Sequence, residues 1–146
     1  MSKEQLKKTV RNYINDNNVC VLATRTGDYV RCTPLEYSYH DDKFWIFSEG
    51  GAKFIGLVKN ENVCLAVFDG YDRFHNLKSV QVMGKAEIIA LFSKCYNVHA
   101  KYKKLPLFAL EQFAATVNLI CVTPTKIEAL FSYFKKDGYD ARQILD

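Results

Sequence analysis

The stretch from Tyr29 to Asn60 constrains the fold of this 146-residue chain more than any other part of it. It contains two strand-like runs joined by a turn at residues 40–43, then a break at Gly50-Gly51. Apolar residues return with helical spacing between Ala52 and Asn60. This order predicts an antiparallel sheet onto which a short helix packs.

Further strand-like segments surround this unit. They are predicted at residues 19–25, 62–69, 80–90, 117–123 and 126–133. Pro124-Thr125 separates the last two. A helix begins at Ser2, where Gln5 completes a capping box, and residues 91–115 have an interrupted helical pattern. About seven antiparallel strands with short helices predict a mainly β fold, a β-barrel with α additions, in a single domain of residues 1–146.

Two residues predict local irregularities in these strands. Before Pro34 the apolar positions are Val30 and Cys32, and after it the phase changes, beginning with Leu35. A proline combined with a change of phase predicts a β-bulge or an edge position. Gly84, in the middle of the strand at 80–90, predicts a bend or the close approach of another backbone.

The composition excludes some classes of protein. Apolar residues make up 49% of the chain and charged residues 25%, which indicates a folded core rather than disorder. The net charge of +4 is compatible with an anionic ligand, but it is too small and too scattered to predict a nucleic-acid partner. An alternative that stays open is single-stranded nucleic acid bound at Lys101, Lys103 and Lys104.

The chain has no apolar run long enough for a signal peptide or a membrane span, so we expect a cytoplasmic protein without a membrane partner. The cysteines are odd in number, widely spaced and free of CxxC pairs, so we expect reduced, buried thiols. These are Cys20, Cys32, Cys64, Cys95 and Cys121. The histidines His40, His75 and His99 have no ligand spacing, so no metal site is expected.

Two cations and a hydroxyl converge on the glycine break. Arg31 lies in the first strand of the Tyr29–Asn60 stretch, Ser48 ends the second, and Lys53 follows Gly50-Gly51 in the first helical turn. A helix dipole disfavours a cation in that turn, so Lys53 there indicates an anion beside it. Cations, a hydroxyl and unpaired backbone N–H groups together predict a phosphate site without a Walker loop. The ordinary alternatives are an exposed strand residue for Arg31 and a helix cap for Ser48.

Five segments share an order and spacing with a known family. They are V-R-x-x-P-L at Val30–Leu35, F-W-I-F-S at Phe44–Ser48, S-x-x-x-x-K at Ser48–Lys53, L-x-x-N-x-x-V at Leu57–Val63 and V-x-G-K-A-E at Val82–Glu87. Their specificity lies in their common order and spacing, and the resemblance extends over about residues 5 to 90. In this order they resemble the pyridoxamine 5′-phosphate oxidase-like family, the FMN-binding split barrels.

The resemblance implies a homodimer with two FMN molecules in clefts between the subunits. Arg31 and Lys53 would bind the FMN phosphate, and Ser48 would donate a hydrogen bond to it. The backbone from Cys32 to Leu35 would follow the edge of the isoalloxazine ring and reach N5 or O4. Ser79 lies where the oxidases have a ring-contacting glutamine. The implied cofactor-binding residues are Arg31, Cys32, Thr33, Pro34, Leu35, Phe47, Ser48, Ala52, Lys53 and Ser79.

The chain departs from the family pattern in three respects. Ala52 replaces a second basic residue before the lysine, and Glu49 places a carboxylate near the expected phosphate. The C-terminal Arg/His segment that the oxidases use on pyridoxal phosphate is also missing. The resemblance therefore implies the fold and the cofactor rather than vitamin B6 oxidation.

We expect an FMN-dependent oxidoreductase that transfers hydride through flavin N5 to or from a small molecule. No nucleophile–base pair and no catalytic residue is evident, which is consistent with chemistry carried by a cofactor. One alternative is a non-catalytic FMN-binding electron carrier. Another is a haem- or tetrapyrrole-binding member of the fold, with His40, His75 or His99 as axial ligand. Tyr37 and Trp45 are expected in the core or in the dimer interface rather than stacked on a flavin.

Overall fold

The computed structural model describes residues 1–73, 76–108 and 117–146. Eight strands in these residues form one antiparallel sheet in the order β2-β1-β5-β6-β7-β4-β3, with β8 paired to β7. The strands are β1 (Val19–Thr26), β2 (Tyr29–Glu36), β3 (Ser38–His40), β4 (Lys43–Ser48), β5 (Asn62–Phe68), β6 (Lys78–Ile89), β7 (Asn118–Phe131) and β8 (Arg142–Leu145). The helices are α1 (Lys3–Asp16), α2 (Lys53–Leu57), α3 (Lys94–Tyr102) and the 3₁₀ helix η2 (Ser132–Asp137). The predicted mainly β fold with α additions is confirmed.

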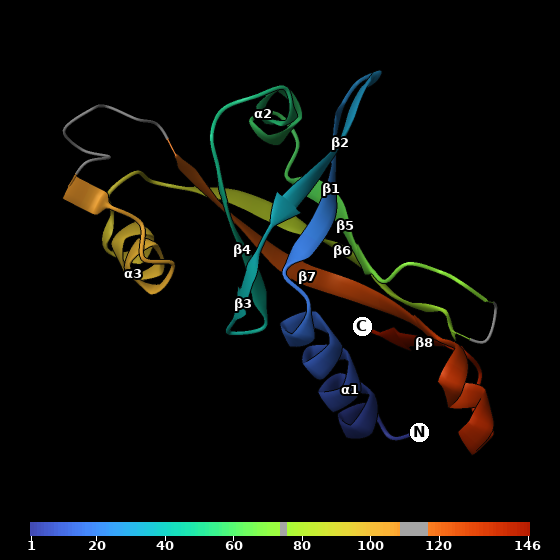
Figure 1. Cartoon of the computed structure of the whole chain (residues 1–146). Coiled ribbons are helices and arrows are strands. Elements are labelled where there is room, and N and C mark those ends of the chain that lie inside the picture. The colour runs from blue at the N-terminus through green and yellow to red at the C-terminus, as the bar shows by residue number, and fades with distance from the viewer. Residues whose placement is uncertain (74–75, 109–116) are drawn as a thin grey trace.

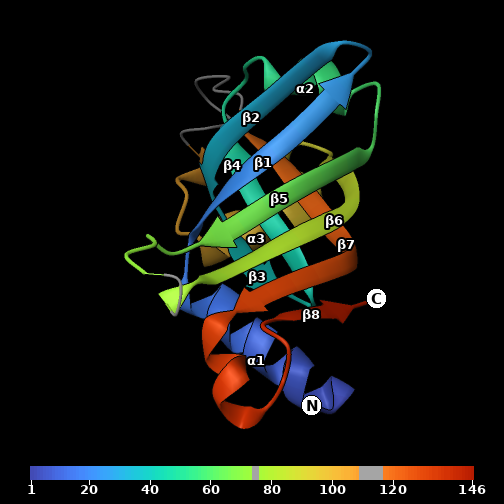
Figure 2. The same cartoon turned by 90° about the vertical axis from the view of Figure 1, so that its right-hand side faces the viewer.

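The sheet curls strongly, so that β2 at one end of the strand order approaches β4 near the other end. Figure 1 shows α2 at the upper end of this half-barrel and α1 at the lower end, with α3 outside β4. Figure 2 shows the outer face of β2, β1, β5 and β6 turned toward the viewer. The two ends of the barrel are therefore covered by different helices.

Alternate side chains along the strands face inward and form the core. Leu22 is paired with Leu65, which is paired with Val82, which in turn is paired with Ile127. All four side chains are at most 9% exposed and face the interior. The helix α1 closes the lower end with its buried residues Leu6, Val10 and Ile14. Its predicted capping box is present, because Ser2 and Gln5 exchange backbone-to-side-chain hydrogen bonds of 2.9 and 3.1 Å.

The prediction of two separate strands at 117–123 and 126–133 is wrong, because β7 is one continuous strand. Pro124-Thr125 lies within it at a bulge, where the pairing with β6 shifts between Met83 and Gly84. A bulge accommodates a proline, because its missing N–H is not needed in the ladder there. The close backbone approach predicted at Gly84 is confirmed, since a Cβ at this position would lie 2.6 Å from the backbone oxygen of Thr123.

Other differences concern the ends of elements. The helix predicted from Ala52 to Asn60 is the short α2, Lys53–Leu57, because Gly56 and the turn after Leu57 leave it little length. The strand β8 was not predicted, and it pairs with β7 through residues such as Ile144. The edge position predicted around Pro34 is confirmed, since β2 ends the strand order. The helical pattern at 91–115 contains α3, but its part at 109–116 lies outside the described residues.

A second apolar cluster lies between β4, β7 and α3. Trp45 is 7% exposed there and packs with Tyr96 and Cys121, and Tyr37 is 3% exposed in the main core. All five cysteines are free, but only Cys20 and Cys121 are buried, so the expected burial is wrong for Cys32 and Cys95, which are exposed. Within the residues described, no helix has the length and hydropathy needed to cross a membrane.

Candidate functional site

The helix α2 packs against the β1–β2 hairpin at the upper end of the barrel (Figure 1). The contact is close because Gly56 has no side chain: a Cβ there would lie 3.0 Å from the backbone nitrogen of Arg25 and 3.3 Å from Cβ of Thr24. Lys53 lies one turn before Gly56, so both residues are on the face of α2 that is turned toward the hairpin. The packing of this one glycine therefore sets where Lys53 lies.

Lys53 is a buried cation without a carboxylate partner. It is 6% exposed and forms no ion pair with a described residue. Its ammonium donates one long hydrogen bond of 3.5 Å to the carbonyl of Gly50 and lies 5.2 Å from the ring centroid of Phe54. Burial lowers the pKa of Lys53, because the ammonium loses hydration there.

Thr24 and Arg31 extend this polar site onto the hairpin. They are directly opposite in the β1–β2 pairing, so their side chains share the face that α2 covers. Thr24 is 3% exposed, and its Oγ1 is buried with no hydrogen-bond partner among residues 1–73, 76–108 and 117–146. Arg31 is exposed and forms no ion pair with any residue that the structure describes. The hydroxyl of Thr24 and the guanidinium of Arg31 are thus available to a ligand on the hairpin against which α2 packs.

Ser48 lies at the end of β4, on the strand that leads into the glycine break. It is 8% exposed, and its hydroxyl donates a hydrogen bond of 2.9 Å to the carbonyl of Glu49. The side chain of Glu49 is exposed. The hydroxyl oxygen of Ser48 retains its capacity to accept, and its proton can be redirected by a rotation about the Cβ–Oγ bond.

The donors carried by α2, by the hairpin and by the end of β4 match a phosphate monoester in kind. An ammonium, a guanidinium and two hydroxyls provide charge and directional hydrogen bonds, and one of those hydroxyls is buried and unpaired. The helix dipole contributes less than the sequence predicts, because α2 contains only five residues. Ala52 contributes backbone only, as the residue that precedes α2. The fit therefore rests on side chains.

The structure separates the residues predicted to contact the ring into two faces of β2. Thr33 and Leu35 are paired with the buried Leu22 and Cys20 and so face the interior with Arg31. Cys32 and Pro34 face the opposite, outer side. Because β2 is an edge strand, alternate N–H and C=O groups along it have no strand partner, and these groups are available to a ligand.

Two other predicted residues lie apart from this site. Phe47 faces α3, where its ring centroid is 5.5 Å from that of Tyr96, so its side chain belongs to the second apolar cluster. Ser79 is paired with Phe68 at the start of β6, and both line a surface depression of about 320 Å³. From β2 to β6 there are three strand spacings, about 14 Å along the sheet. A single chain therefore does not bring Ser79 to Arg31.

Thr24 is the residue that sequence reasoning missed. The sequence predicts the strand at 19–25 that contains Thr24. The burial of its hydroxyl, however, depends on the approach of α2, which is distant along the chain. The one available signal was a polar residue on the same face as Cys20 and Leu22, both at most 1% exposed. A buried polar residue in an apolar row is informative in this way.

Two of the histidines form an aromatic group with Trp45. The ring of His99 stacks on the indole at 3.7 Å, and His40 contacts Tyr102 at 4.2 Å. Nε2 of His40 is buried without a partner. Burial, and then the charge of His40, lower the pKa of His99 from its ordinary value of 6.5, and Asp41 opposes this weakly. His99 is therefore neutral in the folded protein at neutral pH.

This group predicts that acid destabilises the contact between α3 and β4. Below about pH 6.5 the unfolded chain binds a proton at His99 that the folded chain resists, so stability falls as the pH decreases. We expect the urea midpoint to decrease between about pH 7.5 and pH 5.5, and to decrease less in His99→Leu. The emission of Trp45, the only tryptophan, reports the same titration. Equal pH dependence in both proteins would contradict the assignment.

Comparison with known proteins places the chain in a family. The sequence pattern of the pyridoxamine 5′-phosphate oxidase family matches residues 6–131, and the chain therefore belongs to this family. A comparison with curated proteins found no match. The resemblance recognised in the five sequence segments is confirmed.

Solved structures support the same fold. The chain is similar to an FAD-binding protein from Mesorhizobium loti, with 18% identity, a TM-score of 0.68, and 96% and 94% of the two chains covered. It is similar to the FAD-binding protein of Mycobacterium smegmatis, with 16% identity, a TM-score of 0.63, and 84% and 91% covered. It is also similar to HutZ, the haem storage protein of Vibrio cholerae, with 12% identity, a TM-score of 0.64, and 82% and 89% covered.

Proposed function

We propose that this protein binds FMN and uses it as an oxidoreductase acting on a small molecule. The observation that carries the proposal is Lys53, a buried cation without a carboxylate partner among the described residues, on the helix whose Gly56 packs against Thr24. The hydroxyl of Thr24 is buried and has no hydrogen-bond partner among those residues. A phosphate monoester would supply the missing counter-charge. FMN ends in such a group, and its isoalloxazine ring, when bound, accepts or donates a hydride at N5.

Different residues of the chain would bind the phosphate and the ring of FMN. Lys53 and Arg31 would neutralise the phosphate, and Thr24 and Ser48 would donate hydrogen bonds to it. The unpaired backbone of β2 from Cys32 to Leu35 would position the ring edge. None of these groups is a proton donor or acceptor for the substrate, so we assign them to positioning and to exclusion of water rather than to chemistry.

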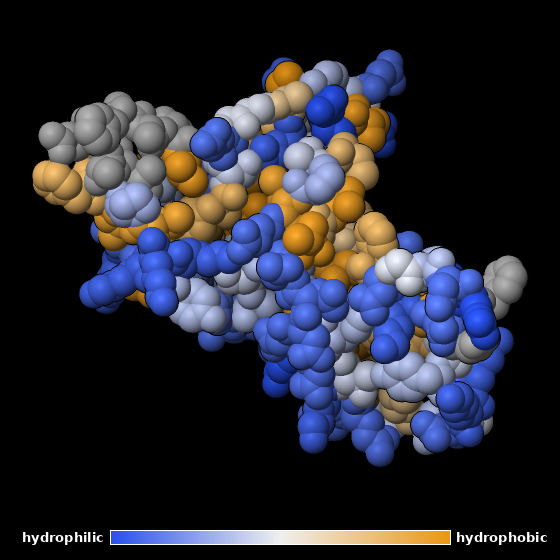
Figure 3. Space-filling model, viewed as in Figure 1, coloured by the Kyte–Doolittle hydropathy of each residue, from blue (hydrophilic) through white to orange (hydrophobic). Residues whose placement is uncertain are grey.

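We further propose that the active form is a homodimer with FMN between the subunits. Ser79 lies about 14 Å along the sheet from β2, so it would reach a ring only from a second copy. The outer face also exposes apolar side chains, among them Val30 at 62% and Phe68 at 55%. Figure 3 shows apolar residues gathered in the hollow below the β1–β2 hairpin. Burial of this face against a second copy would complete the site.

Substitution of Val30 by arginine tests the dimer. Val30 lies on the outer face of β2 and Val98 on α3, and the two are 62% and 58% exposed. We expect Val30→Arg to give a monomer with at least about tenfold weaker FMN binding, because a charge is buried at the proposed interface. Val98→Arg keeps the mass and the affinity of the wild type. Light scattering measures the mass, and an unchanged dimer in Val30→Arg would contradict the proposal.

The enzyme proposal is tested by the ligand and by turnover. Mass spectrometry of the molecule released from purified protein is expected to give FMN. If the molecule is FAD instead, the group bound by Lys53 and Arg31 would be a pyrophosphate. Steady oxidation of NADH or NADPH with a soluble acceptor is expected from an oxidoreductase. An electron carrier, the alternative, would be reduced once and then stop without a partner reductase.

Haem is the second ligand to consider, because HutZ is described as a haem storage protein. The geometry favours flavin. Nε2 of His40 is buried, and the ring of His99 lies against Trp45, so the two described histidines do not offer an open axial position. The visible spectrum of the purified protein distinguishes the two cofactors directly.

A further inference from the structure

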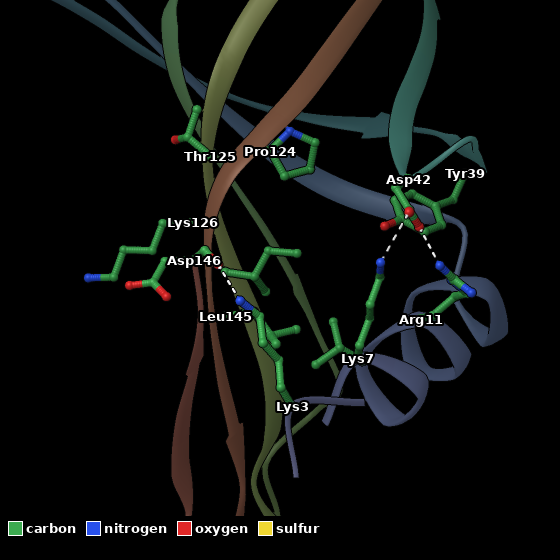
Figure 4. Close-up of a pocket in the computed structure, with 12 residues that line it drawn as sticks. Lys3, Lys7, Arg11, Tyr39, Asp42, Pro124, Thr125, Lys126, Leu145 and Asp146 are labelled. Atoms are coloured by element: carbon green, nitrogen blue, oxygen red, sulfur yellow. Dashed lines mark hydrogen bonds and ion pairs between the residues drawn. The ribbon is translucent and has the colours of Figure 1, made fainter. Parts of the chain in front are cut away.

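A second cavity lies at the opposite end of the barrel from Lys53. It is enclosed by α1, the turn between β3 and β4, the bulge in β7, and the end of β8, and its volume is about 340 Å³ (Figure 4). In Figure 1, α1 lies at the lower end of the molecule and α2 at the upper end. The cavity therefore shares none of the residues assigned to FMN.

One part of the wall of this cavity is apolar. Val10 of α1 and Ile127 of β7 line it and are 2% and 9% exposed, and Leu145 of β8 and the ring of Pro124 complete the apolar surface. Tyr39 lines it from β3. A volume of this size and an apolar lining are typical of sites for small organic molecules.

The rim is positively charged. Lys3, Lys7 and Arg11 all line the cavity and follow one another at intervals of four residues on one side of α1. Like charges at this spacing repel one another by a few tenths of a kcal/mol, so the arrangement favours an anion. Asp42 neutralises part of the charge, with Arg11 at 2.8 Å and Lys7 at 3.7 Å. Asp146 also lines the cavity, and its carboxylate offsets a further part, which leaves the lysines and Arg11 in excess.

The unused donors are concentrated between Lys3 and Lys7. Two cations share the single carboxylate of Asp42, and the contact of Lys7 is the longer one. Lys3 donates to the backbone oxygen of Asp146 at 3.0 Å, which uses one of its three protons. Lys126 does not contribute, because it is bound to Glu128 at 2.9 Å. Figure 4 shows Lys126 directed away from Lys7 and Arg11.

We propose that this cavity binds a small amphipathic anion, with the acidic group between Lys3 and Lys7 and the apolar body against Val10, Ile127 and Leu145. The acidic group is a carboxylate or a phosphate monoester, since both match two ammonium groups one helical turn apart. The apolar walls select against a free inorganic anion, which would leave them in contact with water. This site is independent of the proposed flavin function.

Titration with decanoate, followed by methyl NMR, tests the proposal on the whole chain. We expect saturable shifts centred on the methyl groups of Ile127 and Leu145, and weaker binding of decanol, which lacks the charge. Decyl phosphate is the second arm, and the tighter of the two anions identifies the preferred acidic group. Shifts centred elsewhere, or no saturation, would overturn the proposal.

A matched pair of substitutions separates the site from general attraction to a basic helix. Lys7→Gln and Lys8→Gln each remove one charge from neighbouring positions of α1, but only Lys7 lines this cavity. We expect about tenfold weaker decanoate binding in Lys7→Gln and less than about twofold in Lys8→Gln. Both side chains are exposed, so both variants fold. Equal affinities in the two variants would refute the site.

Discussion

Lys53→Met is expected to weaken FMN binding about thirtyfold while making the ligand-free protein more stable. A charge-assisted hydrogen bond to phosphate contributes about 2 kcal/mol, which corresponds to that change in Kd. In the absence of ligand the same ammonium is buried with no carboxylate partner among the described residues, and burial lowers its pKa. Methionine fills the space without the charge, so the free energy of unfolding rises by about 1 kcal/mol.

Opposite signs for binding and stability distinguish a ligand-binding lysine from a structural one. Fluorescence titration of the flavin measures the first quantity and urea unfolding of the ligand-free protein the second. Lys59→Met, on the exposed residue just after α2, is the control and is expected to change neither. A destabilised Lys53→Met protein with normal FMN affinity would show that Lys53 is part of the framework only.

Gly84→Ala is expected to lower the free energy of unfolding by about 2–3 kcal/mol. The new Cβ would lie 2.6 Å from the backbone oxygen of Thr123 and 3.0 Å from Cγ1 of Val122. A backbone oxygen held in a strand ladder has no rotamer through which to move, so β6 and β7 must separate locally. The loss arises at the bulge that lets β7 continue through Pro124-Thr125.

Gly70→Ala is the control for this substitution. A Cβ at Gly70 meets no atom within 4 Å, so we expect a change of less than about 0.5 kcal/mol. Urea unfolding of the three proteins gives the comparison. Similar midpoints for Gly84→Ala and Gly70→Ala would mean that β6 and β7 are not held together at this point.

Local signals in the sequence predicted the elements whose causes are local. The capping box at Ser2 and Gln5 forms α1, and the turn Thr26-Gly27-Asp28 joins β1 to β2, with Gly27 at a φ of 55°. Gly84 indicated a close backbone approach without indicating which backbone. In each case the responsible residues lie within a few positions of the feature.

Features that depend on distant partners were not predicted. Pro124 reads as the end of a strand, but pairing with the bulge at Gly84, some forty residues earlier in the chain, lets β7 continue. The strand β8 is short and half exposed, and it forms because β7 offers it an edge. Tertiary pairing overrides local propensity in both elements.

The same limit applies to the candidate site. Arg31, Ser48 and Lys53 lie in one continuous stretch, so local order is enough to propose their association, which stays a prediction. The cavity at α1 joins residues from both ends of the chain, among them Lys7 and Arg11. Their relation to Asp42 depends on the position of the β3–β4 turn, which no local pattern indicates.

The central claim is that the phosphate of FMN is held by the cations that α2 and β2 bring together. Isothermal titration with FMN and with riboflavin, which differ only in that phosphate, tests it directly. We expect the wild type to bind FMN several hundredfold more tightly than riboflavin. This ratio corresponds to about 3–4 kcal/mol of binding free energy, which two charged contacts to the phosphate would contribute. In the double variant Arg31→Ala, Lys53→Met the difference should fall below about tenfold. Equal affinity of the wild type for the two flavins, or an undiminished preference for FMN in the double variant, would contradict the account.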